Sequence, residues 1–167
     1  NKRKYPQSLG LFYSAMSARM GFRPNEEEYI FMGLSSYGDP HRFYKLLAHD
    51  FFVDGKASKN FNFNRNLHRG CSNWRTDLNT LEDQKDLAAA SQKILEDIVV
   101  DLLNDIYKQC PSTNIVFGGG VALNCRLNTR MAKETPFENL WIFPNPGDAG
   151  SAVGAALSVY RPFVNFE

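Results

Sequence analysis

Cysteine is scarce in this sequence, and its spacing argues against two classes of site. The 167 residues include only Cys71, Cys110 and Cys125, which lie far apart and form no CxxC pair. An odd number of isolated cysteines is typical neither of a disulfide framework nor of a thiolate zinc site. Reduced cysteines fit a cytoplasmic protein, so we predict a cytoplasmic location.

Long apolar runs and an excess of one charge are also missing. No segment approaches the roughly 20 apolar residues that a membrane-spanning helix needs. Lys and Arg together number 19 and Asp and Glu 18, so the net charge is +1. This balance provides no general attraction for nucleic acid or anionic lipid, and we expect neither as a partner. The oligomeric state is left open.

Common catalytic signatures are absent as well. The three histidines are scattered, with neither HxxxH nor HExxH spacing, and no Ser-His-Asp arrangement can be argued.

An apolar content of 43% in 167 residues is enough for one domain with a real core. We therefore treat residues 1–167 as a single domain. Because the first residue is Asn and not Met, we expect this domain to be a fragment of a longer protein.

The first half of the chain has helical periodicity and one hairpin signal. Apolar residues recur at helical spacing over 8–20, and Ser8 suits the N-cap of that helix. The apolar run 51–53 meets Asp54-Gly55, a common turn pair, and the alternating segment 61–63 follows. This pattern predicts a β-hairpin.

The second half predicts alternating helices and strands. A helix of about 25 residues begins at Asp83 and is ended by Pro111. Four further elements are expected in the order strand, helix, strand, helix, over 114–117, 121–133, 139–143 and 149–160, with Pro162 stopping the last. Strands joined in this way pair in parallel, with a right-handed crossover between them. The predicted fold class is therefore mixed α/β.

Two glycine turns follow the two predicted strands, and they are the main functional signal. The first contains Gly118, Gly119 and Gly120, and the second runs from Gly147 to Gly150. A glycine turn between a strand and a helix presents backbone N–H groups to an anion, so the pair suggests one nucleotide between them. The alternative is a pair of tight strand-to-helix connections without a ligand.

Three polar side chains are candidates beside these turns. We predict that Asn124 lies one turn into the following helix, where its amide either contacts the nucleotide or faces water. Asp148 is either an N-cap or a ligand for a divalent cation. Glu28 belongs to an acidic run and is a candidate contact for a ribose, the alternative being a solvated charge.

The motifs taken together resemble the O-carbamoyltransferases of the nodulation-factor and antibiotic-biosynthesis type. The resemblance is carried by residues 5–13 (YPQSLGLFY), 32–38 (MGLSSYG), 119–125 (GGVALNC) and 147–150 (GDAG). It implies an actin/Hsp70/sugar-kinase-like (ribonuclease H-like) fold, of which this chain is the second half. One departure is Ile30, which stands where members of the family carry a lysine.

The resemblance also implies a reaction. Carbamoyl phosphate and ATP would yield carbamoyl-adenylate in a separate domain, and the carbamoyl group would then move to the hydroxyl of a small molecule or glycan. The glycines and Asn124 would hold nucleotide, and Asp148 would bind a metal, with Fe, Mg and Mn all possible. The fragment alone is expected to be inactive. A kinase of the same fold and a non-catalytic interaction domain are the alternatives.

Overall fold

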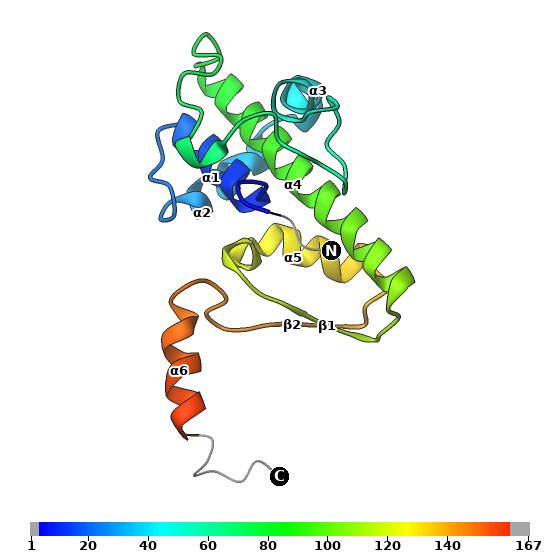
Figure 1. The fold of residues 1–167 in the computed structure, drawn as a ribbon. Helices are drawn as coiled ribbons and strands as arrows, with labels where there is room; N and C mark the ends of the chain where they lie inside the picture. Colours follow the sequence, from blue (N-terminus) through cyan, green and yellow to red (C-terminus); the bar gives the residue numbers. More distant parts are fainter. Residues whose placement is uncertain (1–3, 161–167) are drawn as a thin grey trace.

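The chain is mostly helical, with one small sheet near its C-terminal end. The structure is a computed structural model and describes residues 4–160 (Figure 1). Its helices and strands are α1 (Leu9–Arg19), α2 (Glu28–Leu34), α3 (Pro40–Phe51), α4 (Leu81–Gln109), β1 (Asn114–Phe117), α5 (Cys125–Glu134), β2 (Asn139–Ile142) and α6 (Gly150–Tyr160). Short 3₁₀ helices are η1 (Ser35–Tyr37), η2 (Leu67–Arg69) and η3 (Gly120–Leu123). The mixed α/β class is confirmed at this level.

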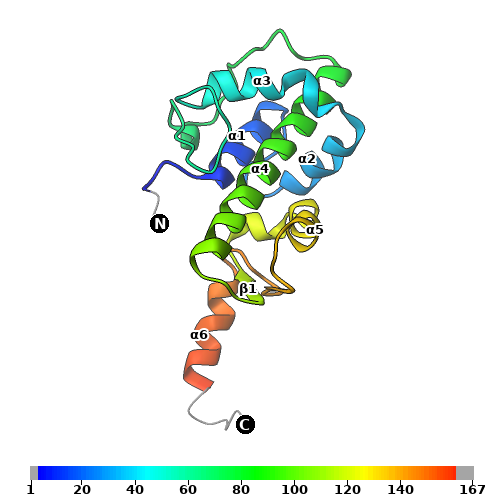
Figure 2. The same cartoon turned by 90° about the vertical axis from the view of Figure 1, so that its right-hand side faces the viewer.

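Helix α4 is the central element of the fold. It begins after Thr80, whose side chain accepts from the Asp83 N–H while the Asp83 side chain accepts from the Thr80 N–H, forming a capping box. It ends at Gln109, close to the Pro111 that was expected to stop it. Helices α1, α2, α3 and α5 all contact α4 (Figures 1 and 2). Among residues 4–160, no helix is long and apolar enough to cross a membrane.

Aromatic side chains fill the core between α1, α3 and the loop that follows α3. The Phe12 ring is fully buried, and its centroid lies 5.7–5.8 Å from those of Phe51, Phe52 and Phe63. Such clusters combine burial of a large apolar area with favourable ring geometry. The N-terminal helix is held by this cluster, and its predicted N-cap is confirmed, since Ser8 Oγ accepts from the Leu11 N–H at 3.4 Å.

The predicted hairpin is only partly formed. Phe51 ends α3 and is not a strand residue. One antiparallel bridge joins Phe52 to Phe63, flanked by a hydrogen bond from the Val53 N–H to Asn62 O and one from the Asn64 N–H to Phe51 O. Asp39 caps a helix that continues through Phe51, so the N–H groups of Phe51 and Phe52 already donate to carbonyl groups of α3.

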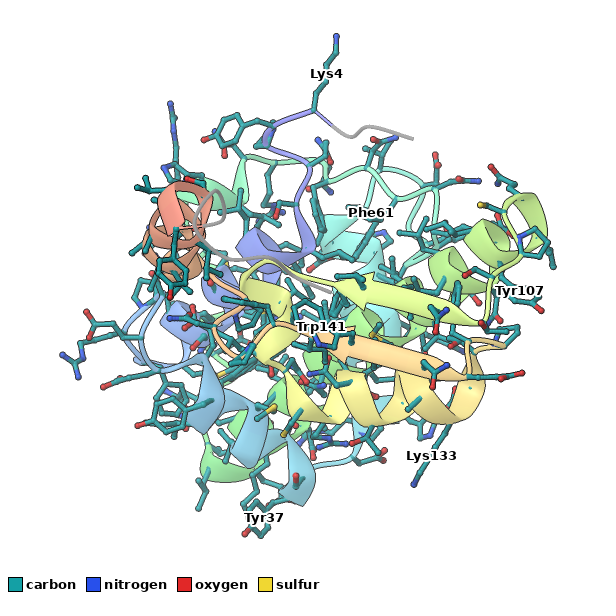
Figure 3. The ribbon with its side chains drawn as sticks, turned by 90° about the horizontal axis from the view of Figure 1, so that it is seen from below. Lys4, Tyr37, Phe61, Tyr107, Lys133 and Trp141 are labelled. Atoms are coloured by element: carbon teal, nitrogen blue, oxygen red, sulfur yellow. The ribbon has the colours of Figure 1, made fainter. Side chains whose placement is uncertain are left out.

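The two strands pair in parallel, as predicted. Asn114 pairs with Asn139, and the register continues to Phe117 and Ile142. One face of the sheet packs on the core through alternate residues, whereas Val116 and Trp141 on the other face are 72% and 54% exposed. Figure 3 shows Trp141 on the side of the strands away from α5. The small sheet is therefore covered on one face by the rest of the described chain.

Helix α6 extends away from the rest of the molecule (Figures 1 and 2). None of its residues is buried, although it is rich in glycine and alanine, whose small side chains permit close packing against another element. Its first residue, Gly150, confirms the predicted start to within one residue. The predicted stop at Pro162 lies outside the described residues.

Candidate functional site

The two glycine turns lie next to each other at one edge of the sheet. They follow β1 and β2, and parallel strands direct their carboxyl ends to the same edge. The Gly119 N–H donates to Pro146 O at 2.8 Å, which ties the first turn to the second. The juxtaposition that the sequence predicted is therefore present, and one backbone hydrogen bond maintains it.

Two of the glycines are required by the geometry, each for a different reason. Gly119 has φ +94°, a conformation that residues with a Cβ rarely adopt. A Cβ on Gly150 would lie 2.1 Å from Asn145 O, so only a hydrogen fits there. Gly118 and Gly120 have open space where a Cβ would stand and are exposed, which leaves room beside the first turn.

The backbone donors available at this edge come from the turns more than from the helices. At the start of α6, the N–H groups of residues 150–152 donate to the carbonyl groups of residues 147–149. Within the described chain, the N–H groups of Gly120, Gly147 and Asp148 donate to no other protein group. Three exposed or half-exposed donors thus surround the paired turns, and such a set suits an anion.

The helix predicted over 121–133 is interrupted, which changes the position of Asn124. The 3₁₀ helix η3 precedes α5, and Asn124 is the N-cap of α5 instead of a residue one turn inside a helix. Its side chain accepts from the Leu127 N–H at 3.0 Å. The side-chain oxygen of an asparagine suits this capping role, so the break occurs where the chemistry favours one.

Asn124 is buried and bonded to α4. Only 8% of the residue is exposed, so the alternative of a water-facing side chain is wrong. Its Nδ2 donates to Gln92 Oε1 at 2.9 Å, and Gln92 Nε2 donates back to Asn124 Oδ1 at 3.0 Å. Reciprocal amide bonds of this kind satisfy polar groups that would be costly to bury alone. They fix the chain after the first glycine turn against the central helix.

The amide pair belongs to a larger buried polar network that the sequence analysis did not identify. The Tyr13 hydroxyl donates to Gln92 Oε1 at 2.6 Å, and Gln92 Nε2 also donates to Glu96 at 2.6 Å. Burial raises the pKa of Tyr13, nearby Glu96 adds to that rise, and Asn124 opposes it. The available signal was the polar pair Gln92 and Glu96, which at i, i+4 lie in one row with the apolar residues Ala88 and Val100 of α4.

Glu28 and Asp148 do not join this network by hydrogen bonds. Glu28 begins α2, and its carboxylate accepts from the Ser14 hydroxyl and from the Asn25 N–H. Its negative charge affects the network only electrostatically, because it contributes to the raised pKa of Tyr13. The ion pairs at the network are formed by Glu96, whose carboxylate lies 3.7 Å from Arg126 Nε and 3.5 Å from Arg130 Nη1.

Asp148 lies in the second turn with an exposed side chain. Its main-chain carbonyl accepts from the N–H and the hydroxyl of Ser151, at 3.1 and 2.7 Å. Its carboxylate accepts from no described residue, so the side-chain cap that was one alternative is not formed. Within residues 4–160, no group of three or more His, Cys, Asp or Glu side chains is arranged to hold a metal ion.

Comparisons with known proteins identify relatives over nearly the whole chain. The family described as carbamoyltransferase N-terminus matches residues 2–157. The uncharacterised protein sll1178 of Synechocystis is 38% identical over 98% of this chain and 29% of its own length. The nodulation protein NolO of Bradyrhizobium diazoefficiens is 34% identical over 91% of this chain and 28% of its own length.

A third relative also matches most of this chain with a small part of its own length. The uncharacterised protein MJ1058 of Methanocaldococcus jannaschii is 33% identical over 90% of this chain and 25% of its own length. The chain therefore spans less than a third of the length of these three relatives.

Proposed function

Because this chain belongs to the carbamoyltransferase N-terminal family, we propose that it is part of an ATP-dependent enzyme that transfers a carbamoyl group from carbamoyl phosphate to a hydroxyl group. The acceptor would be a small molecule or a glycan. We propose further that the described chain is the second half of an actin-like domain. Its share of that activity would be to hold the nucleotide, and the rest of the reaction would need the longer protein.

The proposed nucleotide site is the edge where the glycine turns meet. The hydrogen bond from the Gly119 N–H to Pro146 O is the observation that carries the proposal, because it holds two anion-binding turns side by side. The free N–H groups of Gly120 and Gly147 would donate to phosphate oxygens. The open space beside Gly118 and Gly120 lets those oxygens approach the backbone. Gly150 would contribute by allowing the second turn to close.

Asn124 has a positioning role in this proposal. Its amide is engaged with Gln92 and with the first turn of α5, so it fixes the direction in which the chain leaves the glycine turn. A direct contact between Asn124 and the nucleotide would require that amide to leave Gln92. Glu28 stays a predicted ribose contact, and its carboxylate would have to exchange its bonds to Ser14 and Asn25 for such a contact.

The proposal of a metal site concerns Asp148 alone. One exposed carboxylate on Asp148 can supply one oxygen to a divalent cation, whereas hard cations take about six or more ligands. The described residues do not build a complete metal site. Water and phosphate oxygens would have to complete the coordination.

The backbone donors have a clear chemical use in carbamoyl transfer. When a carbamoyl group leaves a phosphate oxygen, negative charge develops on that oxygen, and preorganised N–H groups stabilise it. The acceptor hydroxyl must also lose a proton to a general base. The described residues supply the first function at the glycine turns, and no residue is proposed as the base.

Calorimetric titration of the chain with ATP would test the proposal with an isosteric pair at Gly120. This glycine is exposed, has open space for a side chain and lacks a positive φ, so both variants should fold. Gly120→Asp puts a carboxylate beside the phosphates, and Gly120→Asn puts a neutral group of the same size there. We expect Gly120→Asp to bind ATP at least about tenfold more weakly than Gly120→Asn.

A control and a contradictory result complete this test. Gly33→Val alters another glycine with open space, on α2, and should leave ATP binding unchanged. Equal ATP affinity of Gly120→Asp and Gly120→Asn would contradict a phosphate site at the first turn. Circular dichroism of each variant confirms that the comparison is made between folded proteins.

A further inference from the structure

A cavity is formed around η2 and the start of the loop between η2 and α4, apart from the glycine turns. Its volume is about 480 Å³, and its lining includes three arginines, Arg65, Arg69 and Arg75. No carboxylate belongs to the lining. The loop between η2 and α4 lies in the upper part of the molecule in both Figures 1 and 2, whereas the turns after β1 and β2 lie in the lower part. The cavity is therefore distinct from the proposed nucleotide site.

The loop that forms the cavity is held by specific contacts and not merely by packing. Arg19 on α1 donates to Trp74 O at 2.8 Å, to Arg75 O at 2.6 Å and to Leu78 O at 2.7 Å. The Trp74 indole N–H donates to Asp50 Oδ2 at 2.9 Å. One guanidinium that binds three carbonyl groups gives this irregular segment a defined shape. The cavity is thus preformed in the described structure.

Backbone strain is also present at the cavity. Arg75 has φ +45°, a conformation that is unfavourable for a residue with a Cβ. Gly70, which also lines the cavity, has φ +72° and carries no such penalty. Two residues of the cavity lining therefore have left-handed backbone conformations, and one of them carries a side chain.

The three arginines differ in how far their hydrogen-bonding capacity is used. Arg65 donates to Asp50 O and to Asn64 and lies over the Phe51 ring, with its Cζ 4.7 Å from the ring centroid. Arg75 is paired with Asp77 at 2.8 Å. The side chain of Arg69 forms no hydrogen bond or ion pair with any residue between 4 and 160, and only its backbone N–H is engaged, with Asn66 O. Its guanidinium is therefore available to an external ligand.

Further donors in the lining are unused. The backbone N–H groups of Ser72 and Asn73 donate to no described residue, and both side chains belong to the same lining. The carboxylates nearest to the loop already have partners, since Asp50 accepts from Trp74 and His49 and Asp77 accepts from Arg75. The cavity thus combines a surplus of positive charge with a surplus of hydrogen-bond donors.

We propose that this cavity binds a phosphate-bearing small molecule at a site separate from the glycine turns. Guanidinium groups bind phosphate through paired N–H···O bonds, and a phosphate offers more acceptor oxygens than one carboxylate does. A volume of about 480 Å³ lies within the range of small-molecule sites and would accept a diphosphate with an attached group. Arg69 is the principal contact, and the Ser72 and Asn73 N–H groups complete the set of donors.

Calorimetric titration with inorganic pyrophosphate tests this site in the chain as it exists. Arg69→Ala removes a side chain that bonds no described residue, so it should fold like the wild type. We expect it to weaken one pyrophosphate-binding event at least about tenfold, since a bidentate charge-assisted contact is lost. Lys133→Ala removes one positive charge from exposed Lys133 at the end of α5 and should leave binding unchanged.

A second pair of variants separates this site from the glycine turns and from a purely electrostatic effect. Asn73→Asp places a carboxylate in the cavity at constant size, and we expect it to weaken the same event that Arg69→Ala weakens. Gly120→Asp should leave that event intact, so failure of the nucleotide proposal and failure of this one are distinguishable. Equal pyrophosphate affinity of Arg69→Ala and Lys133→Ala would overturn the proposal. Binding of a polyglutamate peptide but not of pyrophosphate would overturn it also, in favour of protein docking.

Discussion

The helical part of the molecule, from α1 to α4, is far better packed than the segment from β1 to α6. The helical part contains the fully buried Phe12 and the aromatic cluster around it. The segment from β1 to α6 exposes Val116 and Trp141 on one sheet face and buries no residue of α6. The candidate nucleotide turns lie in the second region. Stability and proposed chemistry are therefore supplied by different parts of the chain.

Two leucines measure this contrast with the same chemical change. Leu47 on α3 is 0% exposed, whereas Leu157 on α6 is 48% exposed. We expect Leu47→Ala to lower the free energy of unfolding by about 2–5 kcal/mol, since three buried carbon atoms are lost and a cavity remains. Leu157→Ala should change it by less than about 0.5 kcal/mol. Urea denaturation of both variants makes the comparison, and a large loss for Leu157→Ala would contradict an unpacked α6.

Substitution of Gln92 tests the contact between the two regions. It should have the second largest effect on the free energy of unfolding. Gln92→Leu keeps the volume but leaves Asn124 and Tyr13 buried without their partner. We expect a loss of about 1–3 kcal/mol in the free energy of unfolding, because buried polar groups without hydrogen bonds are destabilising. Gln84→Leu, at a partly exposed position near the start of α4, is the matched control. If the two variants unfold at the same urea concentration, the amide pair does not join the regions as inferred.

Removing the Asp83 carboxylate from the capping box of α4 should have the smallest effect on the free energy of unfolding. We expect this effect to depend on pH. The hydrogen bond from Thr80 lowers the pKa of Asp83, burial opposes this, and the Arg42 guanidinium adds to the lowering. A carboxylate with a lowered pKa stabilises the fold above its unfolded pKa, and that contribution is lost as the pH falls through the folded value. Asp83→Asn should therefore be less stable than wild type at neutral pH, and the two should converge in acid.

Denaturation curves from about pH 6 to pH 2 measure this convergence, which involves at most one proton per molecule. Glu82→Gln removes a neighbouring carboxylate whose side chain is 66% exposed, so it controls for the loss of one charge. A constant difference between Asp83→Asn and wild type across that range would show that the capping box does not contribute in this way.

Prediction from the sequence succeeded where the determining interactions are local. Ser8 at the start of α1 and Pro111 after α4 mark helix ends through their own backbone chemistry. It failed at Phe51, because the apolar run 51–53 suits either a strand or a helix end. Phe51 belongs to α3 because the helix begun at Asp39 continues to it. Local patterns could not choose between these two outcomes.

The candidate site also combines features that could be predicted from the sequence with features that could not. The pairing of the two glycine turns was predictable, because parallel strands bring their carboxyl ends to one edge. The burial of Asn124 was not predictable, because its partner Gln92 lies 32 residues away in sequence. The arginine cavity also escaped prediction, since Arg19 shapes it from a helix that precedes it by more than 45 residues.

The sequence by itself determined the family, the order of helices and strands and the two glycine turns, because periodicity, capping residues and motifs act over a few neighbouring positions. Only the tertiary structure decided that Asn124 is bonded to α4, that α6 is left without a packing partner and that three arginines line one cavity. Each of these depends on which distant groups meet in space, and a polar or charged side chain has the same local pattern whether its partner is water or a buried amide.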